Sequence, residues 1–227
     1  MGTQSAAVVL ACGRAAGSKG LSELAERDGI DVFHVAARPG KADVDGLLRE
    51  LGGRAIVLGT DADLNAVVLR LLRTERLADV ALGYVPVSGA SEVAATWDLP
   101  TDPRRALEAA LHGEADRVPL VRDDNGGVLV GLGTIGPVRG VGYCDDTRVL
   151  RGPAKLIRVT PLPGAGLQVA VAHRGLVNRR EQVTAGRSFE IGCLSTIVTR
   201  DGVPHERPQK RWTWYRHTED LRLVRGV

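Results

Sequence analysis

The chain has 227 residues, which is enough for one large domain or two small ones. Its 30 basic and 27 acidic residues leave a net charge of +3, and this near balance argues against nucleic-acid binding as the main task. Three distant cysteines, no apolar run of transmembrane length and no basic signal-peptide region at the N-terminus predict a cytoplasmic protein that meets lipid only peripherally.

The first half of the chain alternates between strand-like and helix-like segments. Apolar runs predict strands at 6–11, 31–36, 55–58 and 80–85, and helical spacing predicts helices at 21–26, 44–51, 64–73, 91–97 and 103–111. Such alternation is typical of a parallel sheet covered by helices. We therefore predict a Rossmann-like α/β domain over residues 1–118, with its ligand beyond the carboxyl ends of the strands.

One strand-to-helix turn in this half has unusual chemistry. Gly59 ends an apolar run, and helical spacing begins at Leu64. Backbone N–H groups at the start of a helix can bind phosphate. Two acidic residues, Asp61 and Asp63, fit a metal-bound nucleotide or a ribose hydroxyl better than a bare phosphate. Capping of the helix by these aspartates is the alternative, and the pattern leaves both interpretations open.

The second half reads as a run of strands without a convincing helix. The strand-like segments are 127–132, 155–160, 167–172, 188–191, 195–199, 211–215 and 221–224. They predict an antiparallel, sandwich-like domain over residues 119–227, with a hairpin connection at 163–166. The G-x-G-x-x-G run at 131–136 does not predict dinucleotide binding, because the residues from Pro137 to Gly142 cannot form the helix that this motif requires.

Three segments resemble the diacylglycerol kinase catalytic domain family of lipid kinases. Residues 56–68, IVLGTDADLNAVV, are similar to its turn Gly-Gly-Asp-Gly-Thr followed by a hydrophobic residue and Asn. Residues 82–111 are similar to its Pro-x-Gly-Thr-Gly-Asn-Asp segment and the helix after it, and residues 199–202 to its late Asp-Gly-Glu turn. The segments occur in the family's order and span most of the chain.

This resemblance implies a kinase that uses ATP and magnesium to phosphorylate the hydroxyl of a lipid or another small molecule. The first domain would bind the nucleotide and the second, β-rich domain would serve as substrate or lid domain. Asp201 would be the base that accepts the hydroxyl proton. The resemblance implies no particular metal-ligating residue, and it implies nucleotide contacts from Gly17, Gly59, Asp61, Asn65, Ser88 and Gly89.

The chain also departs from the family at three motifs. Asp63 stands at the place of the central Thr, Ser91-Glu92 at the place of Asn-Asp, and Val203 at the place of the late Glu. These losses favour an alternative function, a catalytically silent relative that binds a nucleotide or lipid phosphate as a regulator or scaffold. Asp201-Gly202 is also a common hairpin sequence, so a structural turn is the alternative there.

The expected partners follow from a basic segment near the C-terminus. Residues 200–217 contain five Lys or Arg and two Asp or Glu, and Lys210 to Arg216 interleaves basic with aromatic residues. Such a segment suits a membrane interface or an anionic headgroup. The alternative is an edge strand with Trp212 or Trp214 packed inward. The expected partners also include a second copy of the chain.

Overall fold

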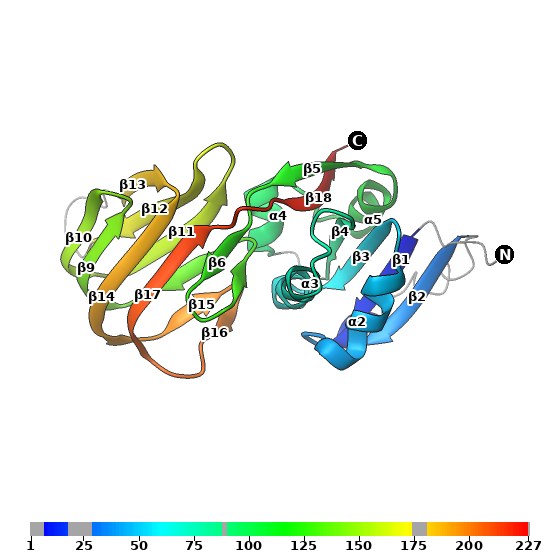
Figure 1. Cartoon of the computed structure of the whole chain (residues 1–227), viewed down its shortest axis with the longest axis horizontal. Helices are drawn as coiled ribbons and strands as arrows, with labels where there is room; N and C mark the ends of the chain where they lie inside the picture. The colour runs from blue at the N-terminus through cyan, green and yellow to red at the C-terminus, as the bar shows by residue number, and fades with distance from the viewer. Residues whose placement is uncertain (1–6, 18–28, 88–89, 174–180, 227) are drawn as a thin grey trace. The chain divides into compact units, whose positions relative to one another are not determined.

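The computed structural model describes residues 7–17, 29–87, 90–173 and 181–226. The chain forms two compact units (Figure 1). The first unit comprises residues 1–118 and 219–227, and the second comprises residues 119–218. The chain therefore leaves the first unit after Val118 and returns to it for its last strand.

The first unit contains a mixed six-stranded sheet in the order β2-β1-β3-β4-β18-β5. The first five of these strands run parallel, and β5 is antiparallel to β18. Their bounds are Ala7–Cys12 (β1), Ile30–Val35 (β2), Arg54–Gly59 (β3), Ala81–Pro86 (β4), Glu114–Val118 (β5) and Leu221–Gly226 (β18). The strands β1 and β4 are buried along their whole length, as continuous apolar runs in covered parallel sheets are.

Helices cover this sheet, and glycine permits one of them to come close. The bounds are Gly13–Gly17 (the 3-10 helix η1), Lys41–Glu50 (α2), Asp61–Arg73 (α3), Glu92–Trp97 (α4) and Pro103–His112 (α5). Helix α5 packs through Ala106 and Ala110 against Val9, Ile56 and Val85 of the sheet. A Cβ atom at Gly83 would lie 2.9 Å from the Cβ of Ala110, so only glycine fits where α5 crosses β4.

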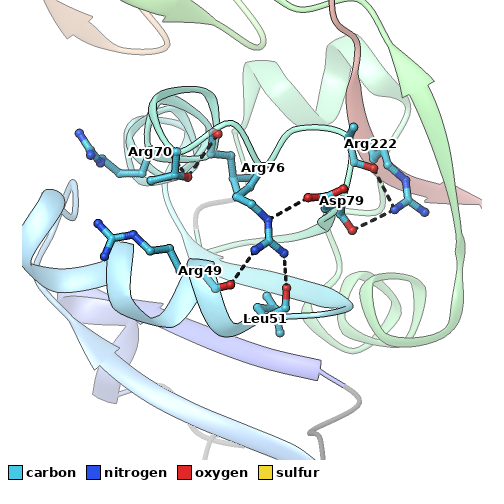
Figure 2. A network of polar contacts seen from close by, with 9 residues as sticks. Arg49, Leu51, Arg70, Arg76, Asp79 and Arg222 are labelled. Carbon is cyan, nitrogen blue, oxygen red and sulfur yellow. Dashed lines mark hydrogen bonds and ion pairs between the residues drawn. The ribbon is translucent and has the colours of Figure 1, made fainter.

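A network centred on Arg76 fixes the edge of the sheet at which β4 and β18 begin (Figure 2). Its guanidinium donates to the carbonyl oxygens of Arg49 and Leu51 at 2.6 Å each, and it pairs with Asp79 at 3.1 Å. Arg222 of the last strand donates to the carbonyl oxygen of Asp79 at 3.1 Å. These bonds satisfy carbonyl groups at the end of α2 and tie the C-terminal strand into the first unit.

The second unit consists of two six-stranded antiparallel sheets that share one core. The sheet orders are β10-β9-β14-β17-β6-β7 and β13-β12-β11-β8-β15-β16. The shared core contains residues of both sheets, among them Phe189, Trp212 and Trp214 from one and Val159 and Val169 from the other. The strand bounds are Val121–Asp123 (β6), Val128–Leu129 (β7), Gly133–Ile135 (β8), Val138–Cys144 (β9), Thr147–Ala154 (β10), Leu156–Leu162 (β11), Gly166–Ala172 (β12), Glu181–Gly186 (β13), Ser188–Thr196 (β14), Val198–Arg200 (β15), Val203–Pro204 (β16) and Gln209–Arg216 (β17).

Three features differ from the sequence prediction or decide between its alternatives. The last strand lies in the first unit, whereas the predicted second domain ran to residue 227. The structure also contains strands that the sequence pattern did not predict, among them β5, β9, β10 and β13. Trp212 and Trp214 are buried in the core, so the inward-packed alternative is the observed one. No helix in the described part of the chain is long and apolar enough to cross a bilayer.

Candidate functional site

The turns that follow β1 to β4 meet at the carboxyl edge of the parallel sheet. A Cβ atom on Gly13, after β1, would lie 2.9 Å from the Cβ of Ala37, after β2. The backbone N–H of Arg38 donates to the carboxylate of Asp63, after β3, at 2.6 Å. Ligands of open parallel sheets bind at this edge. The structure therefore brings the glycine-bearing turns together where the sequence predicts a ligand.

Asp63 holds the turn after β3 in place with its own carboxylate. The carboxylate accepts from the backbone N–H and the hydroxyl of Thr60, both at 2.8 Å. The hydroxyl of Thr60 in turn accepts from the backbone N–H of Asp63 at 3.4 Å, so the two residues form a capping box at the start of α3. Asp63 is buried, with 4% of its surface exposed. Thr60, and not an aspartate, is the N-cap residue of this helix.

The same carboxylate fills the space above Gly59. A Cβ atom on Gly59 would lie 2.8 Å from a carboxylate oxygen of Asp63. The N–H groups of Arg38 and Thr60, which a phosphate would use at such a turn, already donate to this carboxylate. Glycine at position 59 is thus explained by the close approach of an internal anion. The turn after β3 carries its own negative charge at the place predicted for a ligand's charge.

Asp61 joins the turn after β3 to the start of α4. One carboxylate oxygen accepts from the hydroxyls of Tyr84 at 2.8 Å and Ser91 at 2.5 Å. The other oxygen accepts from the backbone N–H groups of Glu92 at 2.8 Å and Val93 at 3.3 Å. Asp61 therefore caps α4 rather than the helix in which it lies. These four donors use the positions that a carboxylate offers to a metal ion or a ribose.

Burial and negative charge also act on two neighbouring groups. Burial raises the pKa of the Tyr84 hydroxyl well above its ordinary value, and the nearby Asp61 carboxylate adds to the effect. Burial, and next the charge of Asp63, raises the pKa of the Cys12 thiol to about 12. Both groups are therefore neutral at pH 7. Tyr84 acts as a hydrogen-bond donor to Asp61, and Cys12 is no thiolate nucleophile.

The positive charge at this edge stays exposed. Arg14 lies in η1, Arg38 follows β2, and Lys41 begins α2, and all three side chains are exposed to solvent. None of them forms an ion pair with another residue among 7–17, 29–87, 90–173 and 181–226. Because Asp61 and Asp63 are saturated by internal donors, these cations are the charges that remain for a ligand. The arrangement suits a phosphate-bearing molecule.

For the other nucleotide-contact residues implied by the resemblance, the structure gives positions but no contact that indicates a ligand. Gly17 is the last residue of η1, and Asn65 is half-buried in α3. Ser88 and Gly89 lie outside the described residues. Tyr84 and Arg38 take part in the site although sequence reasoning did not select them. A tyrosine in an otherwise apolar strand is the signal that could have indicated a buried partner for Asp61.

Asp201 occupies a tight hairpin turn in the second unit. Thr199 pairs with Pro204 and Arg200 with Val203, so Asp201-Gly202 is a two-residue loop, with φ of 43° and 82°. The Asp201 carboxylate accepts from the backbone N–H groups of three successive residues, 130 to 132, at 2.7 to 3.0 Å. Only 1% of Asp201 is exposed. These contacts describe a carboxylate that fixes a loop, and its role as a base stays a prediction.

The described residues contain no group of three or more His, Cys, Asp or Glu side chains arranged to hold a metal ion. This observation agrees with the saturation of Asp61 by hydroxyl and backbone donors. A magnesium site at this edge would need these carboxylates to exchange their present partners for the ion.

Comparison with solved structures identifies proteins of the same fold. A diacylglycerol kinase from Bacillus anthracis str. Sterne superposes with a TM-score of 0.71 at 14% identity, over 99% of this chain and 98% of that one. A putative diacylglycerol kinase from the same strain gives 0.71 at 13% identity over 100% and 99%. An NAD kinase from Archaeoglobus fulgidus in complex with ATP gives 0.52 at 12% identity over 97% and 93%. No protein-family model matches the chain, and no curated protein matches its sequence. The chain thus has the fold of lipid and small-molecule kinases.

Proposed function

We propose that this protein binds a nucleotide or another phosphate-bearing small molecule at the carboxyl edge of its parallel sheet, without transferring phosphate. The fold supports the binding half of the proposal, since a structure of this fold contains ATP. The converging turns and the exposed cations Arg14, Arg38 and Lys41 supply the charge that phosphates need.

The observation that carries the second half is the internal use of both aspartates. Phosphoryl transfer depends on placing the phosphates and neutralising the charge that develops on them, which kinases do with metal ions held by carboxylates. Asp61 accepts four hydrogen bonds, and Asp63 fills the space above Gly59. The carboxylates present therefore do not fit a magnesium site, and we derive no transfer step through one. The exposed cations at this edge suit ATP bound without magnesium, with its phosphates near Arg14 and Arg38.

An active lipid kinase is the second candidate. Its support is the extent of the structural match. The superposition spans 98% to 99% of the length of the Bacillus anthracis proteins called diacylglycerol kinases. In that case the acceptor would be the hydroxyl of a lipid, with Asp201 as the base implied by the resemblance. This candidate requires Asp61, Asp63 and Asp201 each to give up hydrogen bonds that the structure contains.

Two assays on the full chain separate the candidates. Calorimetric titration with ATP, with and without magnesium, measures binding, and transfer of labelled γ-phosphate to a panel of diacylglycerol and other lipid alcohols measures turnover. Magnesium-independent binding without transfer is expected. Magnesium-dependent transfer to any lipid would establish the kinase instead. Failure to bind ATP would overturn the nucleotide form of both candidates, and failure to bind inorganic phosphate as well would overturn the phosphate site itself.

A matched pair of variants tests the location of the site. Arg14→Gln with Arg38→Gln should weaken ATP binding at least tenfold, because both exposed cations at the sheet edge are lost. Arg104→Gln with Arg105→Gln removes the same charge from the exposed surface of α5 and should change affinity less than twofold. Equal loss in the two double variants would mean that ATP responds to overall charge rather than to this edge.

A further inference from the structure

The outward face of one sheet in the second unit carries a row of residues that no core packing explains. Across β10, β9, β14 and β17, Arg151 pairs with Val141, Val141 with Gly192, and Gly192 with Arg211 (Figure 1). The four residues of the row are exposed, whereas the alternate residues point into the core. The two arginines stand three strand spacings apart, roughly 14 Å.

Exposed aliphatic side chains lie between these charges. Leu194 is 67% exposed and Val141 is 41% exposed. Beside them runs a shallow groove lined by Pro137, Arg139, Pro153 and Leu194. A Cβ atom on Gly192 would meet no atom within 4 Å, so nothing in the described part of the unit covers the centre of the row. Burying leucine and valine side chains lowers the free energy, and here a large part of each side chain stays exposed to water.

The charge on this face is strongly one-sided. Arg139, Arg148, Arg151 and Arg211 are all exposed, and none forms an ion pair with another described residue. One acidic residue, Glu190, lies in the same paired rows, opposite Tyr143 and Thr213. Four arginines against one glutamate concentrate on one face a positive charge as large as the net charge of the whole chain.

We propose that this face, which we call the arginine face (Arg139, Val141, Arg148, Arg151, Gly192, Leu194 and Arg211), binds the surface of an anionic phospholipid membrane. Arginines near such a surface are attracted by its negative potential, and aliphatic side chains between them enter the headgroup region. A single-stranded nucleic acid would call for fully exposed aromatic rings on which bases stack, whereas Trp212 and Trp214 of this sheet are buried and Tyr143 and Tyr215 are half-buried. Lipid therefore matches both the charge and the exposed leucine.

This inference goes beyond the proposed function and fails independently of it. The arginine face belongs to the second unit, and the proposed phosphate site belongs to the first. Membrane binding through it requires no nucleotide. Vesicle binding measured in the absence of ATP therefore tests the arginine face alone.

The experiment is sedimentation of the full chain with vesicles of phosphatidylcholine, with or without one part in three of phosphatidylglycerol. Binding to the anionic vesicles alone, weakened by salt, is expected. Arg151→Gln with Arg211→Gln should lower the partition coefficient about thirtyfold, since one basic side chain at such a surface accounts for about fivefold. The control Arg104→Gln with Arg105→Gln, of equal net charge, should change it less than twofold.

A second readout tests whether the apolar centre enters the membrane. On addition of anionic vesicles the emission of Leu194→Trp should shift to the blue, whereas that of the unmodified protein, whose three tryptophans are already buried, should stay where it is. Equal binding to neutral and anionic vesicles, or an equal loss in both double arginine variants, would overturn the proposal. So would an unshifted Leu194→Trp emission together with binding of heparin or an oligonucleotide that depends on Arg151 and Arg211.

Discussion

The carboxylate of Asp63 lies 2.6 Å from the backbone nitrogen of Arg38, a residue 25 positions earlier in the chain. This bond joins the turn after β2 to the turn after β3 and places a negative charge where parallel sheets of this kind accept phosphates. An internal carboxylate thus takes the hydrogen bonds that a ligand would otherwise receive.

Replacing Asp63 should therefore have opposite effects on stability and on ligand binding. Asp63→Ala leaves the backbone N–H groups of Thr60 and Arg38 without their acceptor and should lower the free energy of unfolding by about 2 kcal/mol. The same change frees these N–H groups and removes a negative charge. ATP should then raise the melting temperature of Asp63→Ala by more than it raises that of the unmodified protein.

Asp102→Ala is the matched control for this experiment. Asp102 caps α5 by accepting from the backbone N–H of Arg105 at 2.9 Å, so its loss costs about 1 kcal/mol in the same unit. It should leave the thermal shift caused by ATP unchanged. If Asp63→Ala and Asp102→Ala respond equally to ATP, Asp63 does not occupy a phosphate position.

Asp61 should contribute to the stability of the first unit through its four hydrogen bonds. In Asp61→Asn the single amide oxygen can serve the N–H groups of Glu92 and Val93, while the hydroxyls of Tyr84 and Ser91 must turn to accept from the amide nitrogen. We expect a loss of about 1 to 2 kcal/mol in urea unfolding. Tyr84→Phe, which removes one donor to Asp61, should cost about 1 kcal/mol.

The proposal that the protein binds a nucleotide without transferring phosphate also predicts how Asp61→Asn affects nucleotide binding. If Asp61 only joins the turn to α4, ATP affinity should change little and magnesium should make no difference. A variant that keeps its stability within the range above but loses magnesium-dependent ATP binding would favour the kinase candidate. The two measurements together separate a positioning residue from a metal-binding one.

An ion pair between two helices makes the first unit sensitive to acid. Both guanidinium bonds from Arg70 to Asp45 measure 2.7 Å, and they hold the pKa of Asp45 below its ordinary value. An aspartate whose pKa is lower in the folded state stabilises the fold above its unfolded pKa of about 4 and loses that contribution as the pH falls through the folded value. Asp45→Asn should therefore cost about 2 kcal/mol at pH 7 and progressively less below pH 4. Urea unfolding measured between pH 7 and pH 3 checks this. If the free energies of unfolding of the two proteins differ by the same amount at every pH, the Asp45–Arg70 ion pair is not the source of the acid sensitivity.

The sequence predicted the elements whose residues follow a regular period. The apolar spacing of α3 from Leu64 matches a helix whose Leu64, Val67, Val68 and Leu71 are fully buried. The Pro163–Gly166 connection between β11 and β12 was predicted correctly from its turn residues. Local rules suffice in these places because the decisive contacts lie within a few residues.

The remaining differences depend on contacts between distant segments. Strand β9 contains Gly140 and Gly142, which weaken any strand pattern, yet β14 approaches Gly140 so closely that no side chain would fit. The last strand resembles its predecessors in composition, and only its pairing with β5 and β4 assigns it to the first unit. The partners of Asp61 and Asp63 come from residues 84 to 93 and from residue 38, which the spacing of a turn does not reveal.

Two glycines in adjacent residue pairs of β9 and β14, Gly140 (opposite Cys193) and Gly192 (opposite Val141), offer a direct test of this close approach. A Cβ atom on Gly140 would lie 2.3 Å from the carbonyl oxygen of Gly192, whereas a Cβ atom on Gly192 would meet nothing within 4 Å. Gly140→Ala should lower the free energy of unfolding by about 3 kcal/mol, because backbone cannot move aside as a flexible side chain can. Gly192→Ala should change it by less than about 0.5 kcal/mol. Comparable urea midpoints for the two variants would show that β14 does not approach β9 as closely as described.

Asp201 allows the strongest distinction between a catalytic and a structural carboxylate. Asn tolerates the left-handed backbone of Asp201, where φ is 43°, so Asp201→Asn preserves the turn itself. It replaces one carboxylate oxygen by an N–H donor that must face the N–H of Val130 or of Gly131 and Leu132. A structural role predicts a loss of about 2 to 3 kcal/mol in urea unfolding, with ATP binding by the first unit retained.

A catalytic role of Asp201 predicts the reverse pattern of results. Phosphate transfer to a lipid alcohol, if the unmodified protein performs it, would then fall by 100-fold or more in Asp201→Asn, on the order of what a general base contributes, while stability changes little. Gly202→Ala is the control, since its φ of 82° strains the same turn without touching the carboxylate. The contacts to residues 130 to 132 lead us to expect the first pattern, because a carboxylate with 1% exposure and three backbone donors has little access to a substrate proton.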